Sequence, residues 1–258
     1  MIRFKSLGSG SSGNATVVQA RSESHLTHLL IDCGLGIRQL DMRLGQAGML
    51  ADQIDAIFVT HEHGDHIGCA RQLALRDRIP VWMSHGTYTA MGEPDFEGLL
   101  RIACDSVEIE VGGLQVRPFT VPHDAREPLQ LTCSDGDVRL GILTDLGHAS
   151  SHVLGALAGC ATLLLECNHD PQMLAASAYP AFLKRRVGGD WGHLANDAAA
   201  AIAQAIRPHG LRQVVAAHLS EQNNRPELVR RALAGAMACG EADIHVADGK
   251  NGCGWLAA

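Results

Sequence analysis

The stretch Ile54-Asp55-Ala56-Ile57-Phe58-Val59-Thr60-His61-Glu62-His63-Gly64-Asp65-His66 carries the most information in this chain. Its first half is an apolar run of the kind that forms a buried strand. Its second half places four ligand candidates, His61, His63, Asp65 and His66, within six residues, and a tight turn at Gly64 lets side chains on both sides of the turn converge. Imidazole and carboxylate groups suit zinc, iron and manganese. Four of them directly after a strand indicate a catalytic dinuclear metal site.

The composition is that of an ordinary folded protein. The chain has 258 residues, of which 46% are hydrophobic and 19% charged, enough for one large or two small cores. Helix-like and strand-like runs alternate without a linker, so we predict a single domain over residues 1–258. The net charge of −7 is not typical of a protein that coats nucleic acid. A local basic patch beside a metal site is still compatible with it.

The sequence predicts a cytoplasmic protein with no membrane partner. No apolar stretch approaches the roughly 20 residues that a membrane span needs. Met1 leads directly into a strand-like segment instead of a secretory signal. The eight cysteines are scattered and form no C-x-x-C pair, so reduced thiols are expected. The oligomeric state does not follow from the sequence.

The predicted elements alternate between strands and helices along the chain. Strands are predicted at 3–6, 15–19, 28–32, 56–60, 81–83, 106–111, 114–120, 129–133, 139–143, 161–165, 214–217 and 244–246. Helices are predicted at 37–44, 70–75, 172–183, 196–206 and 226–238. Sheets with helices on their outer faces indicate a layered α/β sandwich.

Three further ligand-type residues stand where predicted strands end. His123 follows the strand at 114–120, Asp145 the strand at 139–143, and His218 the strand at 214–217. Taken singly, such residues are more often turn caps or surface positions. Together with the histidine-rich stretch they complete a consistent ligand set.

This set resembles the signature of the metallo-β-lactamase superfamily. The resemblance covers the whole chain and includes Asp32 in Leu30-Ile31-Asp32-Cys33-Gly34. It implies a four-layer αββα sandwich with two metals in a groove at the strand ends, and Asp32 as a residue that orients the metal loop. It also implies two groups of three ligands bridged by Asp145: His61, His63 and His123 for one metal, and Asp65, His66 and His218 for the other.

Four other segments, at 6–14, 166–170, 192–196 and 218–224, resemble the small YycJ-type hydrolases of that superfamily, which are related to its phosphodiesterases and nucleases. The resemblance implies that His193 lies near the scissile phosphate and stabilises the transition state or protonates the leaving oxygen. Asp65 would bind metal and also orient the attacking water. The pattern departs at Ala195, where a serine is expected, and we interpret this as a local change of a helix cap.

Substrate-binding candidates lie in two segments: Ser9, Ser12 and Asn14 in the first, and Asn168 and His169 in the second. The Gly/Ser loop lacks the Gly-Lys-Ser/Thr ending of a P-loop, so a plain hairpin connection competes with a substrate contact. His169 could instead mark a helix start. The basic cluster Lys184-Arg185-Arg186 is either a solvated helix end or a contact to a nucleic-acid backbone.

The predicted function is hydrolysis of phosphodiesters by a metal-bridging hydroxide, in a nuclease and specifically a DNA exonuclease. Two divalent metals about 3.5–4 Å apart clamp the attacking and leaving oxygens of an in-line displacement. Zinc and manganese are the expected metals, with iron also compatible. The expected partner is an anionic phosphodiester, most simply nucleic acid.

Other functions compete with this one. A glyoxalase-like enzyme that cleaves a thioester would use nearly the same ligands, and so would a hydrolase of cyclic nucleotides or other small phosphodiesters. His193 separates the thioester case, because a thioester leaving group needs little acid help. A non-catalytic, metal-stabilised binding module is the alternative from another class.

Overall fold

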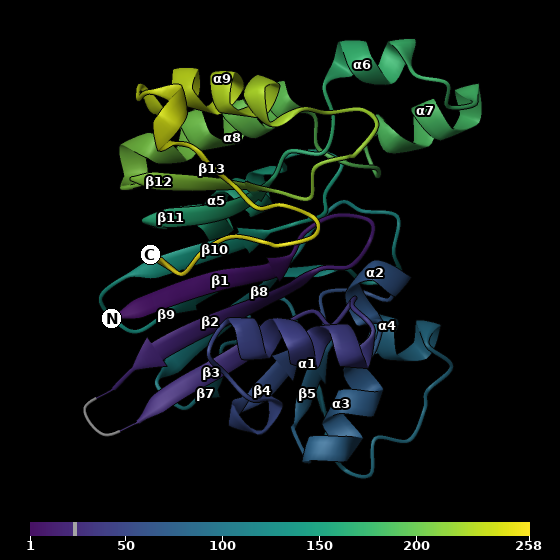
Figure 1. The fold of residues 1–258 in the computed structure, drawn as a ribbon, viewed down its shortest axis with the longest axis vertical. Coiled ribbons are helices and arrows are strands. Elements are labelled where there is room, and N and C mark those ends of the chain that lie inside the picture. Colours follow the sequence, from purple (N-terminus) through teal and green to yellow (C-terminus); the bar gives the residue numbers. More distant parts are fainter. Residues whose placement is uncertain (23–24) are drawn as a thin grey trace.

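Two sheets packed face to face form the centre of the molecule (Figure 1). In the part of the chain that this computed structural model describes, residues 1–22 and 25–258, each sheet has seven strands. Helices cover the outer face of each sheet, as Figure 1 shows. This is the four-layer αββα sandwich that the family resemblance implies.

The first sheet is mixed and has the order β14-β1-β2-β3-β4-β5-β6. Neighbours from β14 to β3 pair antiparallel, and those from β3 to β6 pair parallel. Its strands are β1 (Ile2–Gly8), β2 (Ala15–Arg21), β3 (Leu26–Ile31), β4 (Ala56–Phe58), β5 (Val81–Met83), β6 (Leu100–Ile102) and β14 (Leu256–Ala257).

The second sheet repeats this plan in the order β13-β12-β11-β10-β9-β8-β7. Neighbours from β7 to β10 pair antiparallel, and those from β10 to β13 pair parallel. Its strands are β7 (Ile109–Val111), β8 (Leu114–Thr120), β9 (Leu129–Ser134), β10 (Arg139–Leu143), β11 (Thr162–Glu166), β12 (Gln213–Ala217) and β13 (His245–Val246).

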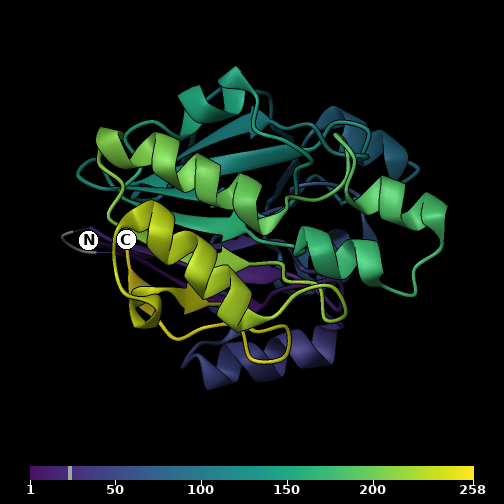
Figure 2. The same cartoon turned by 90° about the horizontal axis from the view of Figure 1, so that it is seen from above.

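The helices form the two outer layers. Figure 2 shows α8 and α9 side by side over the second sheet, with α6 and α7 standing apart from them. None of the helices in residues 1–22 and 25–258 has the length and apolarity that crossing a bilayer requires. The α-helices are α1 (Ile37–Gln46), α2 (Gly64–Ile67), α3 (Ala70–Asp77), α4 (His85–Ala90), α5 (Ser151–Leu157), α6 (Pro171–Ala176), α7 (Ala181–Val187), α8 (Asn196–Ile206) and α9 (Pro226–Met237).

The strand that leads to the metal loop is buried on both faces. Phe58 of β4 packs in the apolar cluster between the two sheets, where Leu131 and Ile142 of the second sheet also lie. Ile57 points the other way, into the cluster that contains Leu40 of α1 and other residues beneath the helices of that side. Successive side chains along a strand point to opposite faces, and both faces of β4 are buried. Every residue of this strand is therefore apolar.

Two predicted elements differ from the structure. The predicted helix at 172–183 is wrong, because α6 and α7 are separate helices: Ser177 is extended and Pro180 precedes the first turn of α7. Proline removes a helical hydrogen bond and disfavours a helical residue before it. The predicted strand at 106–111 is limited to β7, since Ser106 has a φ of +61° and lies outside the extended region.

Candidate metal centre

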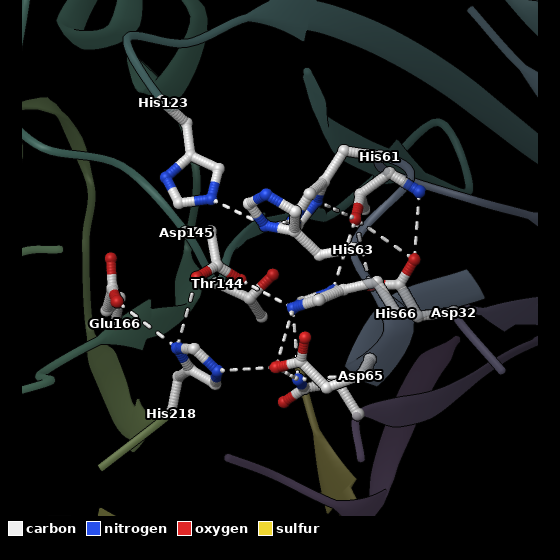
Figure 3. A network of polar contacts seen from close by, with 12 residues as sticks. Asp32, His61, His63, Asp65, His66, His123, Thr144, Asp145, Glu166 and His218 are labelled. Carbon is white, nitrogen blue, oxygen red and sulfur yellow. Dashed lines mark hydrogen bonds and ion pairs between the residues drawn. The ribbon is translucent and has the colours of Figure 1, made fainter. Parts of the chain in front are cut away.

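The predicted ligands from both sheets meet at one edge of the sandwich (Figure 3). The loop from His61 to His66 follows β4 and enters the short helix α2. Asp145 follows β10, and His218 follows β12. Because β10 and β12 both run parallel to β11, their carboxyl ends reach the same edge, and this brings segments far apart in the sequence into contact.

Three imidazole nitrogens form the first group. His61 Nε2 lies 3.0 Å from His63 Nδ1, which lies 3.3 Å from His123 Nε2. A tetrahedral zinc ion with bonds of about 2.0–2.1 Å needs ligand atoms about 3.3 Å apart. His123 Nδ1 donates to Gly192 O at 2.9 Å, which leaves the Nε2 lone pair free to bind a cation. The spacing therefore fits one metal ion.

The second group contains Asp65, His66 and His218. Asp65 Oδ2 lies 3.6 Å from His66 Nε2 and 3.5 Å from His218 Nε2. The other ring nitrogen of His66, Nδ1, donates a hydrogen bond to Asp32 Oδ2 at 2.7 Å. Asp145 lies between the groups, since ligand atoms of His61, His66 and Asp145 all fall within 4.8 Å of one another.

Two buried atoms of the centre have no hydrogen-bond partner among the described residues: Asp145 Oδ2 and His218 Nε2. Asp145 Oδ2 is only 2.8 Å from His66 Nε2, so the two atoms approach without the geometry of a hydrogen bond. Buried polar atoms are almost always satisfied. Lone pairs that converge on one point in this way are satisfied by a cation, so the residues present fit divalent metal ions.

The electrostatics of the centre favour positive charge. Burial lowers the pKa of His66, but the carboxylates of Asp145 and Asp32 outweigh burial and raise that pKa to about 10. Burial likewise opposes charge on His218, whereas the charge of Asp145, followed by the nearby carboxylates of Asp65 and Glu166, raises its pKa to about 10. A field that draws protons onto buried imidazoles attracts a divalent cation in the same way.

Asp32 holds the loop in place. Its backbone has a φ of +61°, which is uncommon for a residue other than glycine. Its Oδ1 accepts hydrogen bonds from Thr60 N at 2.8 Å and Thr60 Oγ1 at 3.0 Å, while its Oδ2 faces His66. These contacts agree with the orienting role that the family resemblance implies.

His193 lies beside the second group and is anchored by Glu166. His193 Nδ1 is 2.8 Å from Glu166 Oε1 and 3.0 Å from Asp145 Oδ1. Burial lowers the pKa of His193, but the charge of Glu166 and a hydrogen bond to Asp145 raise it well above its usual value. The two carboxylates therefore favour the protonated form of His193, which lies next to the candidate ligands.

Sequence reasoning missed Glu166 as a functional residue. It is fully buried at the end of β11, and Leu146 N and Leu194 N donate to its Oε2 at 2.8 and 3.2 Å. Its Oε1 lies 3.2 Å from His218 Nδ1. The signal that could have found it is the one that identified Asp145: a carboxylate that ends an apolar strand.

Three of the predicted substrate-binding residues use their side chains for hydrogen bonds within the protein. Ser9 Oγ accepts from His218 N at 2.7 Å, and Asn168 Nδ2 donates to His218 O at 3.1 Å. Asn14 Nδ2 lies 3.2 Å from Asp65 O and 3.0 Å from His66 Nε2. All three side chains are buried, so they hold the ligand loops in position.

The other two candidates differ in exposure. Ser12 is exposed and lines a hollow of about 610 Å³ together with Tyr179. His169 is buried, and its Nδ1 has no hydrogen-bond partner among the described residues. Its backbone pairs with Ala195 in an isolated bridge, next to the start of α8. Of the five candidates, Ser12 is thus placed best to meet a substrate.

Comparison with known proteins agrees with this geometry. A family model described as a beta-lactamase superfamily domain matches residues 27–219. The chain is 33% identical to the exodeoxyribonuclease YycJ of Bacillus anthracis over 96% of each protein. It is 28% identical to the exodeoxyribonuclease WalJ of Streptococcus pneumoniae serotype 2, over 95% of this chain and 90% of that protein.

Solved structures show the same fold at low sequence identity. The metallo-beta-lactamase fold protein YhfI from Bacillus subtilis superimposes with a TM-score of 0.75 at 15% identity, and 100% of each chain is covered. Zn²⁺-bound PqqB from Methylobacterium extorquens gives a TM-score of 0.74 at 17% identity, again over 100% of both chains.

Proposed function

This chain belongs to the beta-lactamase superfamily and is a metal-dependent hydrolase, and on that premise we propose that it is a nuclease that cleaves phosphodiester bonds at DNA ends with two divalent ions. The observation that carries the proposal is His193, held by Glu166 beside the candidate ligands. The two exodeoxyribonucleases that the chain resembles over nearly its whole length support the same class of substrate.

In this proposal, the two ligand groups hold one ion each and Asp145 lies between them. Zinc and manganese both suit a set of imidazoles and carboxylates. Two such ions would supply Lewis-acid polarisation of the phosphoryl group and a nucleophile at neutral pH. The protein supplies the geometry, because buried hydrogen bonds fix the ring orientation of His66, His123 and His218.

His193 acts as the general acid. Its Nδ1 is committed to Glu166 and Asp145, so Nε2 is the atom that donates a proton to the departing oxygen. A quarter of its side chain is exposed, which leaves room for a substrate to approach. Asp65, with 24% of its side chain exposed, orients the attacking water.

The test measures metal content and substrate class on the same preparation. We expect tightly bound divalent metal, turnover of bis(4-nitrophenyl) phosphate, and shortening of single DNA strands labelled at either end. The two end labels report the direction of digestion. Efficient cleavage of a thioester, with every phosphodiester left intact, would overturn the proposal in favour of a glyoxalase-like activity.

A further inference from the structure

Residues 171–192 form an arm that stands apart from the other helices over the second sheet (Figures 1 and 2). The arm consists of α6, α7 and the turn that leads back to His193. It leaves and rejoins the rest of the chain close to the metal centre, because Glu166 precedes it and His193 follows it. Three features of the arm point to a function: exposed aromatic side chains, positive charge and a close attachment to the metal centre.

The first feature is exposed aromatic surface. Phe182 of α7 is 66% exposed and Trp191 is 63% exposed. Large aromatic side chains are usually buried because they lose the most from contact with water. Within the described residues, the other exposed large hydrophobic side chains are not aromatic: Met1, Met42, Leu50, Ile102 and Val107. The arm thus presents two flat apolar faces to solvent.

The second feature is positive charge. The arm carries Lys184, Arg185 and Arg186 against one carboxylate, Asp190, in a chain whose net charge is −7. Lys184 Nζ donates to Ala175 O at 2.6 Å and so ties α7 to α6, but Arg185 and Arg186 are exposed. A local cluster of cations on an acidic protein favours a polyanionic partner.

The third feature is the attachment of the arm to the metal centre. Arg186 Nε lies 2.6 Å from Asp124 Oδ2, and Asp124 is the residue after His123. The carbonyl oxygen of Gly192 accepts the hydrogen bond that orients His123. A Cβ at position 192 would overlap the carbonyl oxygen of Arg186, so the base of the arm is closely packed. Whatever binds to the arm is therefore held next to the site of cleavage.

Resting on the proposed nuclease function, we propose that the arm binds a single-stranded segment of the nucleic-acid substrate. Its bases stack on Phe182 and Trp191, and its phosphates lie along the basic cluster. Stacking on an aromatic face requires an unpaired base, and cations track the backbone without reading its sequence. The arm therefore selects single strands over duplex and does so with little sequence preference.

The first test is binding of the metal-loaded protein to a fluorescent phosphorothioate oligo-dT, which resists cleavage. Phe182→Ala and Trp191→Ala are each expected to weaken binding at least about five-fold. Trp191→Phe is expected to keep the affinity of the parent but to lose the quenching of tryptophan fluorescence that accompanies binding. Met42→Ala, at an exposed hydrophobic residue of α1, serves as the matched control and should bind like the parent.

The second test separates charge from stacking. Arg185→Gln is expected to reduce the slope of log K against log salt by about 0.7, the value for one phosphate contact on a single strand. Arg231→Gln removes another exposed cation, on α9, and should leave that slope unchanged. A duplex of the same length should bind the parent more weakly than oligo-dT does.

The outcomes distinguish this proposal from the proposed function. The arm proposal is overturned if both alanine variants bind oligo-dT as the parent does, or if the parent binds duplex equally well. Turnover of bis(4-nitrophenyl) phosphate by the parent reports on the nuclease proposal separately. A protein that binds oligo-dT through the arm but hydrolyses no phosphodiester would refute the nuclease while supporting the arm.

Discussion

At the residue scale, three histidines of the centre each have one ring nitrogen committed to the protein and the other turned toward the proposed metals. His66 uses Asp32, His123 uses the carbonyl oxygen of Gly192, and His218 uses Glu166. Such partners fix the tautomer and the orientation of a ligand before any metal arrives. These contacts also explain why two charged side chains, those of Asp32 and Glu166, are buried.

Replacing Asp32 by asparagine tests this orienting role. The amide keeps the shape of the side chain but cannot supply the charge that faces His66. We expect affinity for zinc to fall by about 10- to 100-fold, measured by competition with a chromogenic chelator. Asp52→Asn, at an exposed carboxylate outside the centre, is the matched control. Unchanged zinc affinity in Asp32→Asn would refute the orienting role.

His193→Ala tests the general acid. The substitution removes the proton carrier and leaves every candidate ligand in place, so kcat for a phosphodiester should fall by about 10²–10⁴. Metal content, measured by elemental analysis, should stay at the level of the parent. His152→Ala, at an exposed histidine of α5, should keep full activity. Loss of metal in His193→Ala would instead identify His193 as a ligand.

At the element scale, the candidate ligands lie at the ends of strands, and the start of a helix fixes the segment next to His193. Helix α8 begins directly after the His193 segment, and its N-cap residue, Ala195, has no side chain that can accept a hydrogen bond. Serine is among the preferred residues at that position because its hydroxyl accepts from the first turn. The departure from the family pattern at Ala195 thus removes a helix cap.

Ala195→Ser should therefore stabilise the protein. The gain lies near the lower end of the usual range, about 0.5 kcal/mol, because Ala198 N is already satisfied by Asp197 Oδ1. Urea unfolding at fixed metal concentration measures it. Ala201→Ser, at an exposed position inside α8, should lower the stability slightly, since serine is a poorer helix former than alanine. Equal effects at the two positions would contradict the capping argument.

The limits of sequence reasoning also lie at this scale. Patterns of period two and apolar runs predict most strands near the centre, because strands such as β4, β10 and β11 are buried along nearly their whole length. The break between α6 and α7 is missed because the helix-favouring residues on both sides were given more weight than Pro180, which disfavours a helical residue before it. Glu166 is missed as well. Its side chain is held by hydrogen bonds from the backbone of Leu146 and Leu194, and the sequence alone does not predict these contacts between distant residues.

At the scale of the whole molecule, the candidate centre joins the two halves of the sandwich. The loop from His61 to His66 belongs to the first sheet, whereas Asp145 and His218 extend from the second. A metal ion bound to residues from both sheets is bound by the folded state and not by an unfolded chain in which the same residues are far apart. Metal binding should therefore contribute directly to the free energy of unfolding.

Thermal unfolding with and without a chelator measures that contribution. At a free metal concentration of about 1,000 times Kd, one site adds about 4 kcal/mol, and removal of metal should lower Tm accordingly. Asp145→Asn should lose most of this metal-dependent shift, because Asp145 lies between the two ligand groups. Asp137→Asn, in an exposed turn of the second sheet, should keep the shift. If the parent unfolds at the same temperature in both conditions, the ligands do not connect the sheets through metal, and the dinuclear proposal fails with them.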